Sequence, residues 1–94
     1  MMGKYVVYIL ECRDGTYYTG ITNHLDKRLE KHQAGKGAKY TRGRTPVQLR
    51  YLEWVENKSE ALQREYKIKK MSRYKKQILI KSLGVLQNGY TITK

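Results

Sequence analysis

Two runs of apolar and aromatic residues near the start of the chain are separated by a short polar segment, as in a pair of antiparallel strands. Two runs rich in β-branched and aromatic residues, YVVYIL and YYTGI, flank Asp14-Gly15. Such runs on either side of Asp-Gly are typical of a β-hairpin. The pattern therefore predicts one strand near residues 4–12 that pairs with a second near residues 16–22.

The segment after the hairpin has the period and the end signals of a helix. Asn23 with Asp26 three residues later is a typical helix start, and Gly35 is a typical stop. On a helix over residues 25–34, two leucines and His32 fall on one face. We expect that face to pack on the hairpin.

A third strand and two further helices follow a basic segment. Residues 35–46 are rich in Gly, Lys and Arg and are expected to form an ordered or mobile loop. Asn57 with Glu60 three residues on predicts another helix start. The remaining elements are expected as a strand over residues 47–55 and helices over residues 58–71 and 72–83, with an end at Gly84.

The resulting order, β-β-α-β-α-α, predicts an α+β domain. In it a small, mostly antiparallel three-stranded sheet is flanked by three helices. A chain of 94 residues suffices for one domain with a modest core. We expect this domain over residues 1–84 and a weakly held tail over residues 85–94. Because the chain has no Phe, its core must use Leu, Ile, Val, Tyr and Trp54.

Charge adds a class of partner to this picture. The formal net charge is +12, and the cations are concentrated in two segments. Residues 27–50 hold eight Lys or Arg and one acid, and residues 64–81 hold another eight with one acid. Such an excess favours a polyanion. We expect nucleic acid, DNA rather than RNA; an anionic membrane is a weaker candidate because few bulky apolar residues accompany the cations.

The same composition bears on location. No apolar run approaches the roughly 20 residues that span a bilayer. A lone cysteine, Cys12, excludes an internal disulfide and a cysteine-based zinc site. The chain leads from Met1 directly into a strand, so we expect no secretory signal. The expectation is a soluble, cytoplasmic protein, monomeric and without a membrane partner.

The register of the hairpin decides whether Tyr8 and Tyr18 can act together. A two-residue turn would put the two rings on opposite faces of the sheet. A three-residue loop ending at Gly15 instead pairs Tyr8 with Gly20 and Leu10 with Tyr18, so that both rings share a face. We favour this register because glycine suits the last loop position. Taken singly, each tyrosine could equally be an ordinary strand aromatic.

Glu65 occupies an unusual position on its predicted helix. It falls among Ala61, Leu62 and Ile68, inside an apolar stripe. A carboxylate there is costly unless it is paired or holds a metal. Binding of a hard divalent cation, which takes oxygen ligands, would explain a carboxylate at this position. An ion pair with a neighbouring arginine is the alternative.

Arg28 and His32 are four residues apart on the first predicted helix, so their side chains lie side by side. The arginine fork suits a phosphate, and a histidine can accept a proton near neutral pH. A surface cation and a structural histidine are the alternatives. Backbone contact and stacking with nucleic acid are expected from Lys39, Tyr40, Arg42 and Arg44, although a solvated loop would explain these residues equally well.

Five of these residues, in this order, resemble the motif set of the GIY-YIG nuclease superfamily. VVY ending at Tyr8 stands in the place of GIY, and YTG beginning at Tyr18 stands in the place of YIG. Arg28 and His32 match the first-helix arginine and the histidine one turn later. Glu65 matches the metal-binding acid of a later helix.

The resemblance covers residues 4–83 and is closest to the small, stand-alone bacterial members, which share the stretches GAKYTR and REYKIK. It implies that Gly20 and Lys69 also contact nucleic acid. The chain departs from the pattern at Val6, in place of the first Gly of GIY, and at Thr19, in place of the Ile of YIG. No counterpart is found for the further Asn that some relatives carry. The separate targeting domain of most relatives is also not found, so we expect target choice to come from the chain's own surface or from a protein partner.

The family's activity is hydrolysis of phosphodiesters with one divalent metal. By resemblance, Glu65 would hold Mg²⁺ or Mn²⁺, Tyr8 would activate the attacking water, Arg28 would neutralise charge, and Tyr18 would orient phosphate or water. His32 would hydrogen-bond Tyr8 or act as the base. A phenol has a pKa of about 10, and we expect nearby cations to lower the pKa of Tyr8.

The sequence thus predicts a metal-dependent endonuclease, in DNA repair or recombination. The rival hypothesis is a non-catalytic DNA- or RNA-binding accessory protein on a nuclease scaffold. Whether the substrate is duplex, branched or single-stranded is left open by the sequence.

Overall fold

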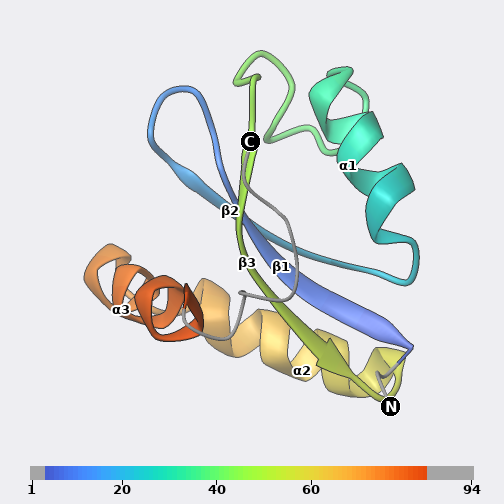
Figure 1. Cartoon of the computed structure of the whole chain (residues 1–94), viewed down its shortest axis with the longest axis vertical. Helices are drawn as coiled ribbons and strands as arrows, with labels where there is room; N and C mark the ends of the chain where they lie inside the picture. The colour runs from blue at the N-terminus through green and yellow to red at the C-terminus, as the bar shows by residue number, and fades with distance from the viewer. Residues whose placement is uncertain (1–3, 85–94) are drawn as a thin grey trace.

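A computed structural model of the chain describes residues 4–84. Within this range the element order is β-β-α-β-α-α, as the sequence predicts (Figure 1). The elements are β1 (Tyr5–Glu11), β2 (Tyr17–Thr22), α1 (Leu25–Gln33), β3 (Gln48–Val55), α2 (Lys58–Lys69) and α3 (Arg73–Gly84). The expectation of a weakly held tail over residues 85–94 lies outside the described residues.

The sheet of the described segment has the order β2-β1-β3, and both pairings are antiparallel. In the hairpin, Tyr8 is opposite Gly20 and Leu10 is opposite Tyr18, so the predicted register is confirmed. Gly15 has φ of 84°, a left-handed conformation that glycine adopts without steric cost. The three-residue loop therefore places Tyr8 and Tyr18 on the same face.

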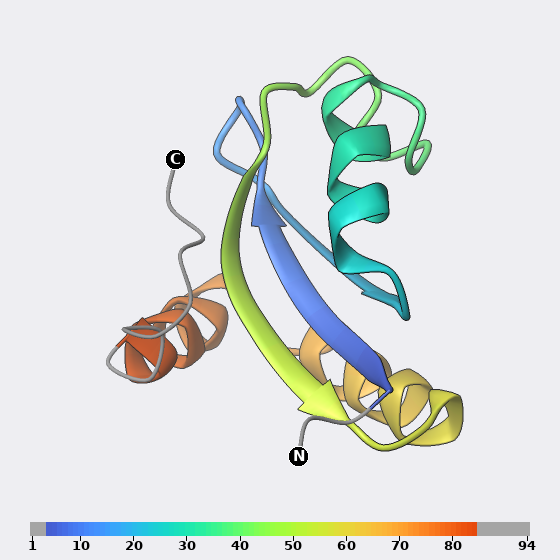
Figure 2. The ribbon, with the colours of Figure 1, turned by 45° about the vertical axis from the view of Figure 1, so that its right-hand side comes forward.

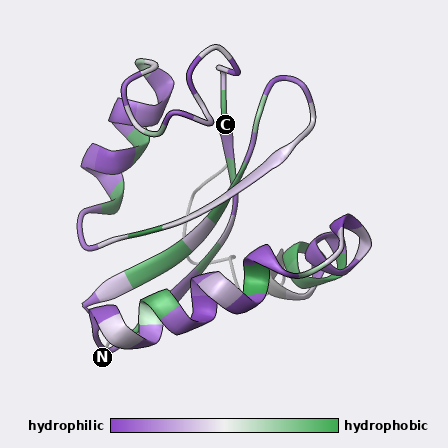
Figure 3. Ribbon diagram, turned by 180° about the vertical axis from the view of Figure 1, so that it is seen from behind, coloured by the Kyte–Doolittle hydropathy of each residue, from purple (hydrophilic) through white to green (hydrophobic). Residues whose placement is uncertain are grey.

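Both faces of β1 are covered, and its residues 6–10 are fully buried. One face packs with α1 through Leu25 and Leu29, and the other packs with α2 through Ala61 and Ile68. Figure 2 shows α1 on one side of the sheet, with α2 and α3 on the other. Seen from behind, α1 is mostly hydrophilic, whereas apolar segments lie on the strands and on α2 and α3 (Figure 3).

Two helix starts test the predicted caps. Asn57 begins α2 as expected, since its side chain accepts a hydrogen bond of 2.9 Å from the backbone N–H of Glu60. The predicted cap at Asn23 is wrong. The N-cap of α1 is His24, which makes no side-chain capping bond, and Thr22 Oγ1 instead accepts a bond of 3.0 Å from the His24 N–H.

Within the described segment no helix has both the length and the apolar character needed to span a bilayer.

Candidate active site

Four of the predicted site residues meet on the face of the sheet that α1 covers. Tyr8 comes from β1, Tyr18 from β2, and Arg28 and His32 from α1. The ring centroids of Tyr8 and His32 are 5.8 Å apart, those of Tyr18 and His32 are 5.2 Å apart, and those of the two tyrosines are 6.3 Å apart. The hairpin register and the four-residue spacing on α1 together produce this cluster.

Tyr8 is the centre of the cluster, and its hydroxyl contacts two other members. Tyr8 Oη and His32 Nε2 form a hydrogen bond of 2.9 Å. Arg28 Nε donates a longer one, of 3.4 Å, to the same oxygen. Tyr8 and His32 are both 0 % exposed, whereas Arg28 is half-buried. The cation thus lies between the buried pair and the solvent, where it can contact an anion.

Gly20 makes this packing possible. A Cβ atom at position 20 would lie 2.6 Å from Tyr8 Oη and 2.9 Å from Tyr18 Cε2. These distances are far inside van der Waals contact, so a larger side chain would displace one of the two rings. The glycine shared with the YIG motif is needed to seat both phenols.

The electrostatics of the cluster correct one expectation. Burial raises the pKa of Tyr8 to about 12, and Arg28 lowers it only in part. The expectation that surrounding cations bring the pKa of Tyr8 below its ordinary value is therefore wrong for this arrangement, because desolvation is the larger effect. Burial, and then the charge of Arg28, lower the pKa of His32 to about 4. Near neutral pH the pair is a neutral phenol bonded to a neutral imidazole.

The basic loop between α1 and β3 extends the cluster toward the surface. The ring of Tyr40 stacks on Tyr18 with centroids 6.0 Å apart, and the Arg44 guanidinium lies 4.3 Å from the Tyr40 centroid. Asp14 in the hairpin loop holds Arg44 through an ion pair of 3.0 Å. Tyr40 is 39 % exposed. The other two predicted contacts of this loop, Lys39 and Arg42, are exposed.

Glu65 is on α2, which packs on the other face of the sheet. Its side chain is 18 % exposed and forms an ion pair of 3.3 Å with Lys69. Leu62 is 47 % exposed, so its predicted place in an apolar stripe with Glu65 is wrong. The neighbouring arginine, Arg64, pairs with Glu53 at 3.0 Å instead of with Glu65. The Glu65 carboxylate is nonetheless close enough to Tyr8 to contribute to the raised pKa of the phenol.

Comparison with known proteins shows the family of this chain. The model of the GIY-YIG catalytic domain matches residues 4–77. The chain belongs to the GIY-YIG family. A UPF0213 protein of Halobacterium salinarum is 59% identical over 73 residues, which cover 78% of this chain and 95% of that protein.

Two solution NMR structures resemble the fold of this chain. The UPF0213 protein from Bacillus halodurans is 47% identical with a TM-score of 0.58, and the match covers 92% of this chain and 93% of that one. A protein from E. faecalis is 37% identical with a TM-score of 0.60, and the match covers 90% and 93% of the two chains.

The GIY-YIG family generally uses a divalent metal, and the donors of this chain can be tested against one. Among residues 4–84 no three His, Cys, Asp or Glu side chains are grouped as a metal cluster. A single, mostly covered carboxylate such as Glu65 fits Mg²⁺, which usually keeps several waters and takes one or two protein carboxylates. An ammonium group at 3.3 Å competes for that carboxylate, so binding a cation would displace Lys69.

Two contacts in this GIY-YIG site were not found from the sequence. Thr41 is 0 % exposed, and its Oγ1 lies 2.9 Å from His32 Nδ1. Asp14 was interpreted as a turn residue, yet it also holds Arg44. A threonine in a basic loop carries no sequence signal for burial, because the contact depends on how the loop folds back on α1.

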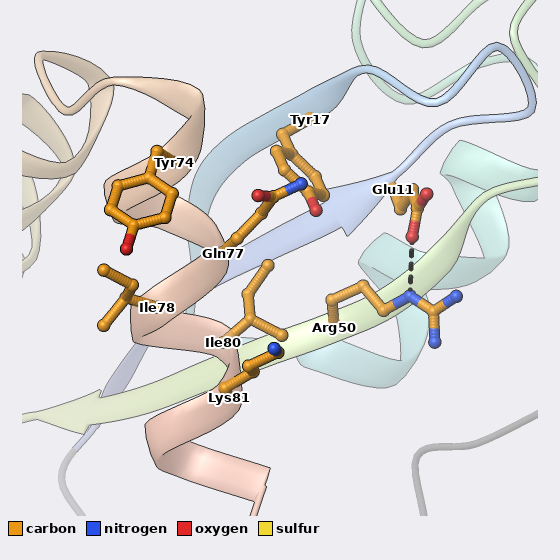
Figure 4. A pocket seen from close by; sticks show the side chains of 8 residues that line it. All are labelled: Glu11, Tyr17, Arg50, Tyr74, Gln77, Ile78, Ile80 and Lys81. Carbon is orange, nitrogen blue, oxygen red and sulfur yellow. Dashed lines mark hydrogen bonds and ion pairs between the residues drawn. The ribbon is translucent and has the colours of Figure 1, made fainter.

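A separate hollow of about 470 Å³ lies away from this cluster, between α3 and the sheet. Tyr17, Tyr74 and Ile80 line it, together with Arg50, which pairs with Glu11 at 2.8 Å (Figure 4). Its lining includes none of the five residues that match the GIY-YIG motifs. This hollow is therefore separate from the residues that match the GIY-YIG motifs.

Proposed function

We propose that this protein is a metal-dependent endonuclease that hydrolyses phosphodiester bonds of nucleic acid, DNA in preference to RNA, in repair or recombination. The observation that carries the proposal is the buried hydrogen bond between Tyr8 and His32 with Arg28 beside it. A phenol, an imidazole and a guanidinium at one point have the functions that this hydrolysis needs: proton transfer and stabilisation of negative charge.

Tyr8 is the residue that takes a proton from the attacking water. Because its pKa is about 12, a stored tyrosinate is not available near neutrality. The phenol instead passes its own proton to His32 Nε2 while it accepts one from water, so that no free phenolate forms. The negative charge of a bound phosphate favours the imidazolium that results, which offsets the lowered pKa of His32.

Arg28 contacts the phosphate from the open side of the pair. Hydrogen bonding to Tyr8 is the main cause that raises the pKa of its guanidinium, so it keeps its charge throughout. Tyr18 orients the phosphate or the water. Tyr40 and Arg44, stacked beside Tyr18, contact the adjacent nucleotide. Glu65 would hold the divalent metal, which when bound supplies Lewis-acid stabilisation of the phosphate oxygens.

One observation favours the alternative, a nucleic-acid-binding protein without catalysis. Glu65 is paired with Lys69, and this ion pair gives the carboxylate a structural partner without any metal. Under this alternative the cations bind nucleic acid, while the Tyr8 cluster is part of the packed core between the sheet and α1.

Glu65→Gln separates the two functions. The exposed acid Glu30 offers a matched control, because Glu30→Gln removes one negative charge from α1. Wild type and both variants are incubated with DNA and RNA duplexes, flaps and single strands, with Mg²⁺ or Mn²⁺ or with EDTA.

We expect Glu65→Gln to lower cleavage at least about a hundredfold, because a few kcal/mol of charge stabilisation is lost. Binding in EDTA should persist or tighten, and Glu30→Gln should cleave as wild type does. Metal-dependent cleavage that is unchanged in a folded Glu65→Gln variant would end the metal-ligand assignment. No cleavage by wild type on any substrate, with binding intact, would favour the accessory protein.

A further inference from the structure

The imidazole of His32 is held at both nitrogens, and the second partner comes from the loop that follows α1. Nε2 is bonded to Tyr8 at 2.9 Å, and Nδ1 is 2.9 Å from Thr41 Oγ1. Thr41 is fully buried, although the residues on either side of it, Tyr40 and Arg42, are exposed. The loop thus turns this one hydroxyl inward onto the ring.

The protons of this chain of contacts can be counted. The Thr41 hydroxyl has one proton, and the Ala38 carbonyl oxygen at 3.1 Å can only accept a hydrogen bond, whereas His32 Nδ1 at 2.9 Å can donate or accept. Its oxygen also accepts a longer bond, of 3.4 Å, from the Ala38 backbone N–H. When the hydroxyl gives its proton to this carbonyl oxygen, Thr41 Oγ1 can only accept from His32. Nδ1 of a neutral His32 therefore carries the hydrogen, and Nε2 carries the lone pair.

We propose that Thr41 is a positioning residue that holds neutral His32 in its Nδ1–H tautomer, so that Nε2 accepts the proton of Tyr8. The consequence for cleavage rests on the proposed function of the site, whereas the tautomer itself does not. In the opposite tautomer, Nε2–H would donate to Tyr8 Oη, and the phenol would have no acceptor for its own proton at His32.

The loop is shaped to make this contact. Gly37 lies against the ring, since a Cβ atom there would be 2.6 Å from His32 Nδ1. A tight turn presents Thr41, with the N–H groups of Thr41 and Arg42 both donating to the Ala38 carbonyl oxygen, at 3.1 and 3.2 Å. The stretch GAKYTR, which resembles the small family members, therefore has a role at the site besides its cations.

Two substitutions isolate the hydroxyl. Thr41→Val keeps the size and branching of the side chain but removes all three hydrogen bonds of the hydroxyl, whereas Thr41→Ser keeps the hydroxyl and removes a methyl group. The chain has two histidines, so nitrogen spectra of the ¹⁵N-labelled protein are assigned with one further variant, His32→Gln. The exposed His24 serves as an internal reference for a ring in solvent.

We expect the Nδ1–H pattern for His32 in wild type and in Thr41→Ser, and a shift of the population toward Nε2–H in Thr41→Val. Cleavage should fall at least about a hundredfold in Thr41→Val, as when a general base is lost, and should stay near wild type in Thr41→Ser. The wild-type spectrum tests the tautomer even if Thr41→Val fails to fold.

An Nε2–H pattern in wild type, or an unchanged Nδ1–H pattern in folded Thr41→Val, would overturn the proposal. Failure of the proposed function is distinguishable from this result. A wild type that shows the Nδ1–H pattern, and a Thr41→Val variant that loses it, support the positioning role even where no nucleic acid is cleaved.

Discussion

Gly20→Ala tests whether the close seating of the two tyrosines is what the site depends on. The added Cβ atom would lie 2.6 Å from Tyr8 Oη and 2.8 Å from Tyr8 Cζ. Ordinary contact begins at 3.4 Å, so the phenol or β2 would have to move by about 0.8 Å, the difference between 3.4 and 2.6 Å. Tyr8 cannot move this far and keep both its 2.9 Å bond to His32 and its 3.4 Å bond from Arg28.

The energetic cost follows from the burial of these groups. Inserting one carbon into a packed core costs about 1–3 kcal/mol. For a domain of this size that corresponds to a fall in Tm of roughly 5–20 °C. A stretched bond to His32 removes the route for the proton of Tyr8, so cleavage should fall at least about a hundredfold.

Gly15→Ala is the matched control. Gly15 has φ of 84° with nothing within 4 Å of an added Cβ, so alanine costs about 1–2 kcal/mol of backbone strain without touching the cluster. Thermal unfolding and cleavage are measured for both variants and wild type. We expect both to be destabilised, but only Gly20→Ala to lose activity. If Gly20→Ala keeps both the Tm and the cleavage rate of wild type, the seating argument is refuted.

Three further outcomes are expected. Because the pKa of His32 is lowered to about 4, the free energy of unfolding should fall by about 3 kcal/mol as the pH falls from about 6.5 toward 4. Urea unfolding at several pH values should show this fall in wild type and little of it in His32→Gln. Thr19 Oγ1 is buried and has no hydrogen-bond partner among the described residues, so Thr19→Val should raise the free energy of unfolding by about 1 kcal/mol. An unchanged or lower free energy of unfolding would mean that the hydroxyl has a hydrogen-bond partner. Nucleic-acid affinity should fall steeply with salt, and Arg44→Gln should reduce the slope of log K against log salt by about 0.9. Arg50 pairs with Glu11 beside α3, so Arg50→Gln should leave this slope unchanged. Equal slopes for both variants would place the nucleic acid elsewhere.

Much of the fold could be predicted because its signals are local. The Asp14-Gly15 loop determines the hairpin register, and the register alone determines that Tyr8 and Tyr18 share a face. The four-residue spacing of Arg28 and His32 likewise follows from helix geometry. The predicted start at Asn23 failed because Thr22 takes over the local hydrogen bond and His24 becomes the N-cap.

The charges and contacts of the site could not be predicted in the same way. The cations of the sequence suggested a lowered pKa for Tyr8, but the pKa depends on how far tertiary packing buries the phenol, and this burial raises it. Leu62 looked apolar enough to be buried beside Glu65, yet the rotation of α2 on the sheet leaves it exposed. Neither quantity depends on neighbours in the sequence.

The sequence by itself determined the elements, the shared face of Tyr8 and Tyr18, and the basic character of the chain, because turn chemistry, periodicity and charge are properties of neighbouring residues. Only the tertiary structure decided which groups touch. Thr41 reaches His32 across nine positions of sequence, and Tyr8 reaches it across 24. Hydrogen bonds and desolvation act over a few ångströms in space, so they are determined only once α1 and its loop have packed on the sheet.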